Sequence, residues 1–183
     1  LAAESRLQPA IENPIEAIVK NCVGTTTVLQ CAREAGVKKV MYSSTSSGYG
    51  MNSYPNVETQ PDDCLNPYSA SKVAAEKFCK MYTDLYGLKT VVFRYFNVYG
   101  ERSPVFGQYA PVIGIFLKQK NEGQPLTIVG DGSQRRDFIH VKDVAAANIL
   151  AATANIPEEY YGQVFNIASS GSISIQEIAN LIS

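Results

Sequence analysis

Short apolar runs alternate with longer amphipathic stretches along the entire chain. The short runs, rich in β-branched and aromatic residues, predict strands at 37–42, 89–95, 126–129 and 164–167. The amphipathic stretches predict helices at 13–35, 67–86, 109–121 and 141–154, and a last helix that Ser174 caps. Strands that alternate with helices require crossover connections, which make neighbouring strands parallel. The pattern therefore predicts an α/β fold with a mostly parallel sheet.

Two of the predicted strands lead directly into runs that could belong to a site. The run 43–47, which consists of hydroxyl residues, comes directly after the first strand, and the run 96–100 follows the second. In open α/β sheets the ligand crevice lies outside the carboxyl ends of the strands. Thr45 is therefore predicted to lie at the active edge of the sheet.

One helix with clear start signals carries two residues suited to proton transfer. Asn66 suits a helix N-cap and Pro67 suits the first turn, so Tyr68 and Lys72 are predicted to lie one turn apart on one face. A phenol has an ordinary pKa of about 10. We expect the Lys72 ammonium to lower the pKa of Tyr68, which would then act as a general base while Thr45 holds the substrate oxygen. A tyrosine four residues before a lysine is a common surface pattern, and only its combination with the hydroxyl-rich strand end favours catalysis.

Composition and charge argue against several classes of protein. The 183 residues are 45% hydrophobic with a net charge of −1, and scattered Lys and Arg argue against a nucleic-acid surface. Four cysteines without short paired spacing and a single histidine predict no metal site, and reduced thiols in a cytoplasmic protein. The N-terminus lacks a signal-peptide pattern, and the apolar stretch 144–156 is too short to span a bilayer. The loop acids Asp62 and Asp63 are interpreted as solvated or as lying near a helix N-terminus.

Four motifs in series resemble those of one enzyme family. They are Ser43-Ser44-Thr45, Tyr68-Ser69-Ala70-Ser71-Lys72, Arg94-Tyr95-Phe96-Asn97-Val98-Tyr99-Gly100, and Gly130-Asp131-Gly132 followed by Arg136-Asp137-Phe138-Ile139-His140. In this order the chain resembles the extended short-chain dehydrogenase/reductase family over essentially its whole length. It is most similar to the NAD-dependent sugar-nucleotide epimerases and dehydratases, especially UDP-glucose and UDP-N-acetylglucosamine 4-epimerases. The resemblance implies a Rossmann-like sheet with helices on both faces, and NAD as cofactor.

The resemblance also implies roles for individual residues. Thr45, Tyr68 and Lys72 match the catalytic triad of the family. The residues that match cofactor-binding positions are Leu1, Ala2, Ala3, Asn21, Ser43, Ser44, Tyr68, Lys72 and Tyr95. The residues that match positions around the nucleotide sugar are Thr45, Ser46, Ser47, Asn97, Gln108, Tyr109, Thr127, Val129 and Arg136. The forked donors of Arg136 suit phosphate oxygens, whereas Arg135 is interpreted as a solvated neighbour.

The reaction that the resemblance implies is 4-epimerisation of a nucleotide sugar through a 4-keto intermediate. Tyr68 removes the proton of the sugar 4-hydroxyl while hydride passes to NAD. Family dehydratases carry an Asp-Glu pair directly after the catalytic threonine, and decarboxylases carry a Glu at the second of these positions. Ser46 and Ser47 hold those places here, which favours epimerisation. A 4,6-dehydratase or another sugar-nucleotide-modifying relative, and a binding module that does no chemistry, remain the alternatives.

Two features of the family have no counterpart in residues 1–183: the glycine-rich phosphate loop, and the acidic residue about 20 positions later. We therefore expect a piece truncated at both ends, without the first βαβ units, that binds NAD poorly and turns over little. Residues 1–100 are predicted to be the C-terminal part of the NAD-binding Rossmann domain. Residues 101–183 are predicted to be part of a small substrate-binding region interleaved with the last Rossmann elements. Helices matching 13–35 and 67–86 form a dimeric four-helix bundle in relatives, so a homodimer is expected.

Overall fold

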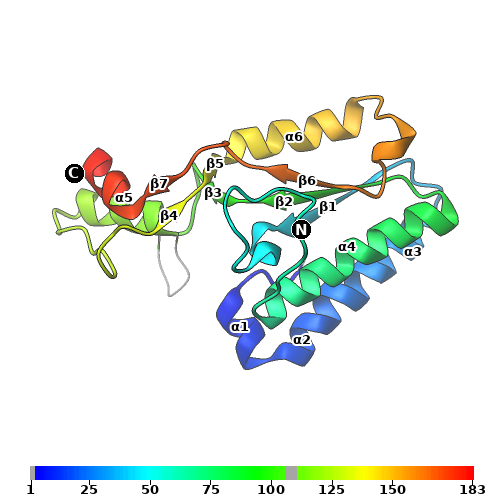
Figure 1. Cartoon of the computed structure of the whole chain (residues 1–183), viewed down its shortest axis with the longest axis horizontal. Coiled ribbons are helices and arrows are strands. Elements are labelled where there is room, and N and C mark those ends of the chain that lie inside the picture. Colours follow the sequence, from blue (N-terminus) through cyan, green and yellow to red (C-terminus); the bar gives the residue numbers. More distant parts are fainter. Residues whose placement is uncertain (1–2, 106–110) are drawn as a thin grey trace. The chain divides into compact units, whose positions relative to one another are not determined.

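The structure, a computed structural model, describes residues 3–105 and 111–183, which form two compact units (Figure 1). Unit 1 comprises residues 1–95 and 147–166, and unit 2 comprises residues 96–146 and 167–183. The chain therefore enters unit 2 at residue 96, returns to unit 1 at residue 147 and enters unit 2 again at residue 167. The first boundary between the units lies close to the predicted boundary at residue 100, and the roles assigned to the two regions stay predictions.

Unit 1 is built on a three-stranded sheet with the strand order β1-β2-β6. β1 (Val40–Thr45) and β2 (Thr90–Tyr95) run parallel, with Thr45 opposite Tyr95. β6 (Val164–Ile167) lies on the other side of β2. The parallel pairing brings the ends of β1 and β2 to the same edge of the sheet, as the sequence predicts.

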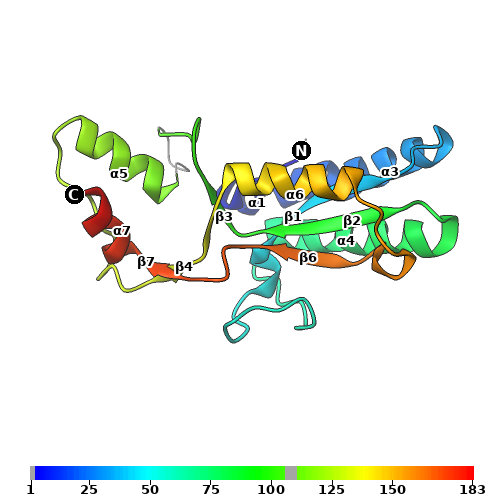
Figure 2. The same ribbon diagram turned by 90° about the horizontal axis from the view of Figure 1, so that it is seen from above.

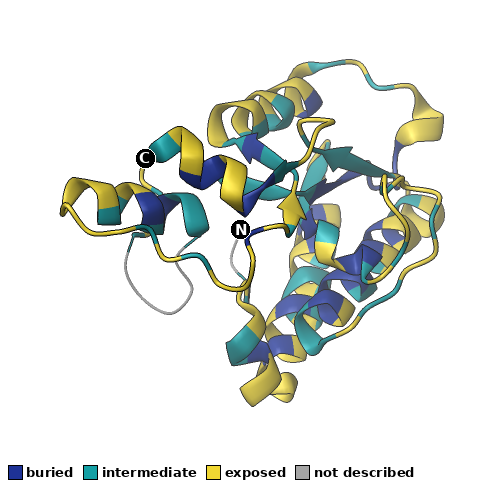
Figure 3. Cartoon of the chain, turned by 60° about the vertical axis from the view of Figure 1, so that its left-hand side comes forward, coloured by how far each residue is buried: buried dark blue, intermediate teal, exposed yellow. Residues whose placement is uncertain are grey.

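Helices cover both faces of this sheet (Figures 1 and 2). α3 (Gly24–Glu34) and α4 (Pro67–Tyr86) lie on one face, and the second half of α6 (Val141–Thr153) lies on the other. The Lys39 ammonium, which donates to the carbonyl of Ala151 at 2.6 Å, ties the end of α6 to the start of the sheet. Figure 3 shows that buried residues gather where the helices face the sheet. The core on the side of α3 and α4 contains Leu29, Ala32, Cys79, Tyr82, Leu88 and Val92.

The predicted helix 67–86 is confirmed at both ends. The side chain of Asn66 accepts a hydrogen bond from the backbone N–H of Ser69 at 2.9 Å, and Pro67 occupies the first position of the helix. Gly87, at a φ of +68°, adopts the left-handed conformation that ends the helix. These local signals set the start of α4, and with it the place of Tyr68.

Helices cover residues 7–12 and 14–34 of unit 1. α2, η1 and α3 follow one another without a break, so the predicted helix 13–35 is confirmed, with one π-helical turn inside it. α1 precedes them and was not predicted. The bounds of the helical segments not yet given are α1 (Leu7–Glu12), α2 (Pro14–Ile18), η1 (Val19–Val23), η2 (Ser46–Tyr49) and η3 (Glu158–Tyr160).

Unit 2 contains two pairs of short strands and two further helices. One pair is parallel and the other antiparallel. The helices meet around the fully buried Phe116, and Ser174 and Glu177 form a capping box at the start of the last helix, as the sequence predicts for Ser174. The elements are β3 (Asn97–Tyr99) with β5 (Phe138–His140), β4 (Arg135–Arg136) with β7 (Ile173–Ser174), α5 (Val112–Asn121) and α7 (Ile175–Ile182).

Two predicted strands need correction. The strand predicted at 126–129 is wrong, because Leu126 and Ile128 pack against the core of α5 and α7 instead of pairing with a strand. The strand predicted at 37–42 begins later, at Val40, and continues to Thr45, because its extent is set by pairing with β2. Within the described residues, no helix has the length and hydropathy that crossing a membrane requires. The same residues contain no cluster of His, Cys, Asp and Glu that suits a metal ion.

Candidate active site

Thr45 and Tyr68 meet at the edge of the sheet of unit 1. Thr45 is the last residue of β1, and Tyr68 lies in the first turn of α4. The Thr45 hydroxyl is close enough to donate a hydrogen bond to the phenol of Tyr68. The same hydroxyl lies 3.1 Å from the hydroxyl of Ser47 and accepts a hydrogen bond from the Ser47 N–H at 3.1 Å. The structure thus brings together two of the three predicted catalytic side chains.

The ionisation of Tyr68 differs from the sequence prediction. Burial raises the pKa of Tyr68, and the hydrogen bond from Thr45 partly opposes this shift. The predicted lowering of this pKa by Lys72 is wrong for the chain on its own, because burial of the phenol dominates. The Lys72 ammonium lies 4.4 Å from the centroid of the Tyr42 ring. In the ligand-free chain, Tyr68 is therefore a neutral phenol at neutral pH.

Lys72 is buried one helical turn beyond Tyr68. Lys72 is 6% exposed. Burial lowers the pKa of its ammonium to about 8, and interactions with Cys79 and Glu76 partly oppose this shift. An ammonium with a pKa near 8 exchanges its proton close to physiological pH. Such a group is unusual for a lysine and typical of functional sites.

Asn21 fixes the start of the described chain to the first turns of α4. Its side chain donates to the carbonyl of Glu4 at 3.0 Å and to the hydroxyl of Ser71 at 2.9 Å, and it accepts from the Glu4 N–H at 2.9 Å. Asn21 is 1% exposed, and Ala3, which precedes Glu4 in the chain, is half-buried. Of the other residues predicted beside the cofactor, Leu1 and Ala2 lie outside the described residues.

A network of charged side chains, centred on the buried pair Arg94 and Glu76, connects the strands and the helix that carry the site. Arg94 of β2 donates to both carboxylate oxygens of Glu76 on α4, at 3.0 and 2.7 Å, and Ser44 of β1 donates to the same carboxylate. Arg94 also donates to Asp62 at 2.6 Å, and Lys77 approaches the other oxygen of Asp62 at 2.8 Å. The network joins the elements that carry Thr45, Tyr68 and Tyr95.

The sequence pattern did not predict this network. Asp62 is an exposed loop residue, as interpreted, but it also pairs with Arg94 and Lys77. Burial raises the pKa of Asp62, and the hydrogen bonds from Lys77 and Arg94 outweigh burial and lower it. Two signals could have revealed the pair: Arg94 interrupts an apolar strand, and Glu76 lies one turn from Lys72 on the same helix face.

The hydroxyl of Tyr95 lies on the side of the sheet that α6 covers. The Tyr95 hydroxyl accepts a hydrogen bond from the Asn148 amide at 2.8 Å and lies 3.4 Å from the hydroxyl of Ser43. Asn148, on α6, was not predicted as a site residue. Its place among apolar residues of a predicted helix was the available signal.

The residues predicted around the nucleotide sugar divide between the units. Ser46 and Ser47 follow Thr45 in unit 1, whereas the remainder belong to unit 2. The Asn97 amide donates to the carbonyl of Asp137 at 2.7 Å, and the exposed Arg136 donates to the carbonyl of Arg135 at 2.8 Å. Thr127 and Val129 are exposed, and Gln108 and Tyr109 lie outside the described residues.

Arg135 is more than a solvated neighbour. Its guanidinium is exposed, but it donates to the hydroxyl of Ser172 at 3.0 Å and to the Glu177 carboxylate at 3.1 Å. Arg135 therefore links β4 to the start of α7. The neighbouring Arg136 is exposed and donates to the carbonyl of Arg135, so it is the arginine of this strand that remains a candidate for binding phosphate.

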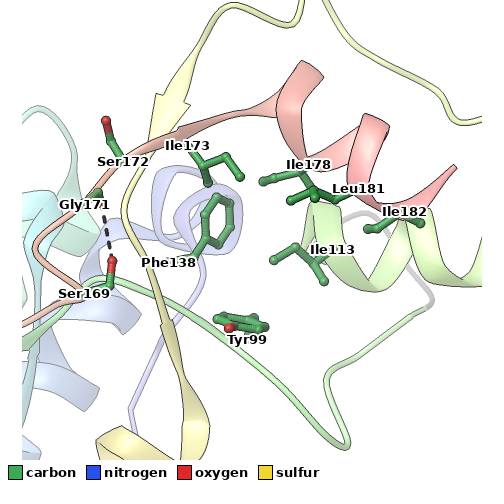
Figure 4. Close-up of a pocket in the computed structure, with 10 residues that line it drawn as sticks. All are labelled: Tyr99, Ile113, Phe138, Ser169, Gly171, Ser172, Ile173, Ile178, Leu181 and Ile182. Carbon is green, nitrogen blue, oxygen red and sulfur yellow. Dashed lines mark hydrogen bonds between the residues drawn. The ribbon is translucent and has the colours of Figure 1, made fainter.

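The apolar cavity of unit 2 contains none of the predicted site residues (Figure 4). Tyr99 and Phe138 come from the β3 and β5 pair, while Ile113 comes from α5 and Ile178 from α7. Its walls carry no charged side chain and are continuous with the core around Phe116. The cavity has neither acid nor base for chemistry, which leaves the Thr45 and Tyr68 edge as the candidate active site.

Comparisons with known proteins show the family to which the chain belongs. Residues 1–168 match the NAD dependent epimerase/dehydratase family. A protein named putative UDP-glucose 4-epimerase, from Methanocaldococcus jannaschii, is 35% identical over 183 residues, which cover 99% of this chain and 58% of that protein. A UDP-N-acetyl-alpha-D-glucosaminuronate decarboxylase from Bacillus cytotoxicus is 38% identical over 187 residues, which cover 98% of this chain and 56% of the relative.

A solved structure shows the same fold. The UDP-N-acetylglucosamine 4-epimerase of Methanobrevibacter ruminantium M1, in complex with UDP-N-acetylmuramic acid, has a TM-score of 0.93 and 34% identity, covering 99% of this chain and 57% of that one. This chain spans a little over half the length of each of the three proteins. The match in sequence and in fold confirms the predicted family: the chain belongs to the NAD-dependent epimerase/dehydratase family.

Proposed function

We propose that this chain carries the catalytic residues of an NAD-dependent nucleotide-sugar 4-epimerase. The observation that carries the proposal is the contact between Thr45 and Tyr68, with the buried Lys72 one turn further along α4. Relatives named as UDP-glucose and UDP-N-acetylglucosamine 4-epimerases support a UDP-hexose or a UDP-N-acetylhexosamine as substrate. Since the chain spans a little over half of these relatives, the proposal concerns the whole protein that contains it.

The described residues fit a nicotinamide cofactor. When bound, NAD supplies an acceptor that takes hydride from the sugar and returns it. The Lys72 ammonium carries three donors and forms no ion pair within the described residues, so its donors suit the hydroxyls of a ribose. Asn21 holds the backbone beside Ala3, and Ser43 and Tyr95 complete the edge in the roles proposed from the family.

In the proposed reaction Tyr68 moves a proton while Thr45 orients it. Tyr68 removes the proton from the sugar 4-hydroxyl and later returns it, and the hydrogen bond from Thr45 stabilises the phenolate that forms. Burial keeps the phenol neutral in the free chain. The positive charge of Lys72, close by on the same helix, favours the phenolate once substrate and cofactor exclude water.

The residues after Thr45 favour epimerisation over loss of water or CO2. Ser47 touches the Thr45 hydroxyl and Ser46 precedes it, so hydroxyl groups occupy the positions where an added acid or base would act. The best alternative is a nucleotide-sugar 4,6-dehydratase or a similar modifying enzyme, and a non-catalytic nucleotide-sugar-binding module is a further one. Because one relative is named a decarboxylase, the test includes the mass of the sugar product, which falls if water or CO2 is lost.

We propose that Arg136 and Asn97 of unit 2 hold the diphosphate, and that the backbone at 127–129 contacts the base. Arg136 is exposed on β4, which suits a guanidinium that pairs with phosphate. Ser46 and Ser47 are proposed to contact the sugar from unit 1. Gln108 and Tyr109 are proposed near the phosphates on the strength of the resemblance alone.

The test uses a full-length protein that carries this chain together with a glycine-rich phosphate loop. Incubation with NAD and UDP-glucose or UDP-N-acetylglucosamine should give the 4-epimer, identified by proton NMR, with no change in mass. A product lighter by one water would show a dehydratase, and unaltered sugar with measurable binding would show a binding module. The 183-residue chain alone serves as the matched control, and we propose that it turns over little.

A homodimer through α2, η1, α3 and α4 is also proposed. Large apolar side chains are exposed along these helices, among them Val23 at 56%, Val28 at 60% and Leu85 at 67%. A groove between α3 and α4, lined in part by Cys22 and Cys31, runs through the same surface. Sedimentation should show a dimer that Val28→Glu converts to a monomer, whereas Met51→Glu, at an exposed loop residue, should leave it intact. A monomeric unmodified protein would contradict the proposal.

A further inference from the structure

Lys72 is a buried cation with an unusual neighbourhood. Within the described part of the chain its ammonium forms no ion pair, although the residue is 6% exposed. Glu76 lies one turn further along the same helix, but its carboxylate already accepts hydrogen bonds from Nε and Nη2 of Arg94 and from the hydroxyl of Ser44. A charged group removed from water needs some other compensation.

The ring of Tyr42 supplies that compensation. The Lys72 ammonium lies 4.4 Å from the centroid of the Tyr42 ring, within the range in which an aromatic face attracts a cation. Tyr42 lies in β1, three residues before Thr45, so the strand that carries the candidate threonine also carries this ring. The electrostatic attraction is strongest where water is excluded, as it is here.

Tyr42 itself is held in place from both sides. Its hydroxyl donates to the backbone carbonyl of Lys72 at 3.4 Å, and it also hydrogen bonds with Thr25 of α3. Burial raises the pKa of Tyr42 above that of a free phenol, so the ring stays neutral. The ring is therefore a fixed and uncharged platform between α3 and α4.

The other titratable groups that face this pair are known. Glu76 and Cys79 face Lys72 from α4, and Cys22 of η1 faces Tyr42. Burial raises the pKa of both Cys22 and Cys79, so both thiols stay neutral at neutral pH. The charge of Glu76 is shared with Arg94. The ring of Tyr42 is therefore the neighbour against which the Lys72 ammonium is placed.

We propose that Tyr42 is a positioning residue, whose ring holds the Lys72 ammonium in place and favours its charged form. This rests on the proposed function in one respect only, namely that a charged Lys72 is needed beside Tyr68. Tyr42 touches neither substrate nor the reacting atoms in this account. It acts through Lys72.

The test measures the ionisation of Lys72 without substrate or cofactor, so its outcome does not depend on whether the protein is an epimerase. The side-chain NMR signal of Lys72 is titrated in protein labelled at lysine and is assigned by its loss in Lys72→Met. Tyr42→Phe retains the ring and should leave the pKa of Lys72 within a few tenths of its unmodified value. Tyr42→Leu removes the ring and should lower that pKa by about one unit.

A graded series keeps the test valid if Tyr42→Leu fails to fold. Phenylalanines with one to five ring fluorines at position 42 preserve the shape of the side chain while they weaken the attraction of its face for cations. The pKa of Lys72 should fall stepwise with fluorination. Tyr86→Leu, which removes a ring stacked on Arg33 at 3.9 Å, is the matched control and should leave Lys72 unchanged.

Two results would overturn the proposal. A Lys72 pKa that is indifferent to ring fluorination would show that the aromatic face does not hold the ammonium. A Tyr42→Phe variant that lowers the pKa as far as Tyr42→Leu would assign the effect to the Tyr42 hydroxyl instead. In the full-length protein the same series should lower the pH at which kcat begins to fall on the alkaline side, while a purely structural role would lower kcat at every pH.

Discussion

The two units hold their candidate residues in opposite environments. In unit 1 the ion pair between Arg94 and Glu76 is buried, with each residue 2% exposed, and Lys72 is buried beside it. In unit 2 Arg135 and Arg136 are exposed on a two-residue strand. Buried charges depend strongly on their neighbours, whereas exposed ones behave much as they do in water. The contrast fits the proposal that a proton is transferred in unit 1 and that unit 2 holds the diphosphate of the substrate.

The largest effect should come from breaking the buried ion pair of unit 1. Glu76→Ala leaves the Arg94 guanidinium buried without its main partner, and we expect a loss of about 3–5 kcal/mol in the free energy of unfolding. Urea denaturation followed by circular dichroism measures it. Arg135→Gln breaks the exposed pair with Glu177 in unit 2 and should barely move the urea midpoint. Equal shifts in the two variants would remove the contrast between the units.

A second prediction concerns the pH dependence of stability in unit 1. Burial lowers the pKa of Lys72 from its ordinary value of 10.5 to about 8. Between these two values the unfolded chain binds a proton that the folded chain does not, so stability should rise with pH across this window. Lys72→Met removes this rise and should be more stable than the unmodified protein at pH 7, by up to about 3 kcal/mol.

The matched control for that titration is Lys38→Met, at an exposed lysine, which should keep the slope of the unmodified protein. Urea midpoints at a series of pH values from 7 to 11 provide the measurement. If the urea midpoints of Lys72→Met and of the unmodified protein change with pH in the same way, burial does not lower the pKa of Lys72.

The smallest effect of the three should come from unit 2. Arg136→Ala removes a proposed phosphate contact that is made equally in the ground state and in the transition state, so KM for the nucleotide sugar should rise roughly tenfold with little change in kcat. Steady-state kinetics of the full-length protein measures both constants. Arg135→Ala is the control, because its guanidinium is turned to Ser172 and Glu177. A fall in kcat instead would place Arg136 in the chemistry.

Local sequence signals predicted the elements that position the site. α4 was predicted at both ends because Asn66, Pro67 and Gly87 act on their own neighbours. β1 was predicted with the wrong bounds, since pairing with β2 decides where a strand begins and ends. The stretch 126–129 has the pattern of a strand, but its apolar side chains pack on helices instead. Pattern alone does not distinguish these two ways of burying the same residues.

The contacts that define the ionisation of the site were beyond sequence reasoning. The lysine was expected to face Tyr68, yet its ammonium lies over Tyr42, and the carboxylate of Glu76 pairs with Arg94 on another strand. These partners are distant in sequence and are brought together only by the packing of α4 on the sheet. The sequence could nominate Thr45, Tyr68 and Lys72 as candidates, whereas their electrostatic environment required the fold.

The measurement that tests the central claim most directly is the rate of 4-epimerisation by the full-length protein with Tyr68→Phe. The substitution removes one hydroxyl and keeps the ring in its half-buried place at the start of α4. We expect the rate to fall by about 10²–10⁴-fold, the contribution of a general base, while the fold and the affinity for the nucleotide sugar are retained. A variant that epimerises at the rate of the unmodified protein would show that the edge where Thr45 meets Tyr68 is not where the proton is transferred.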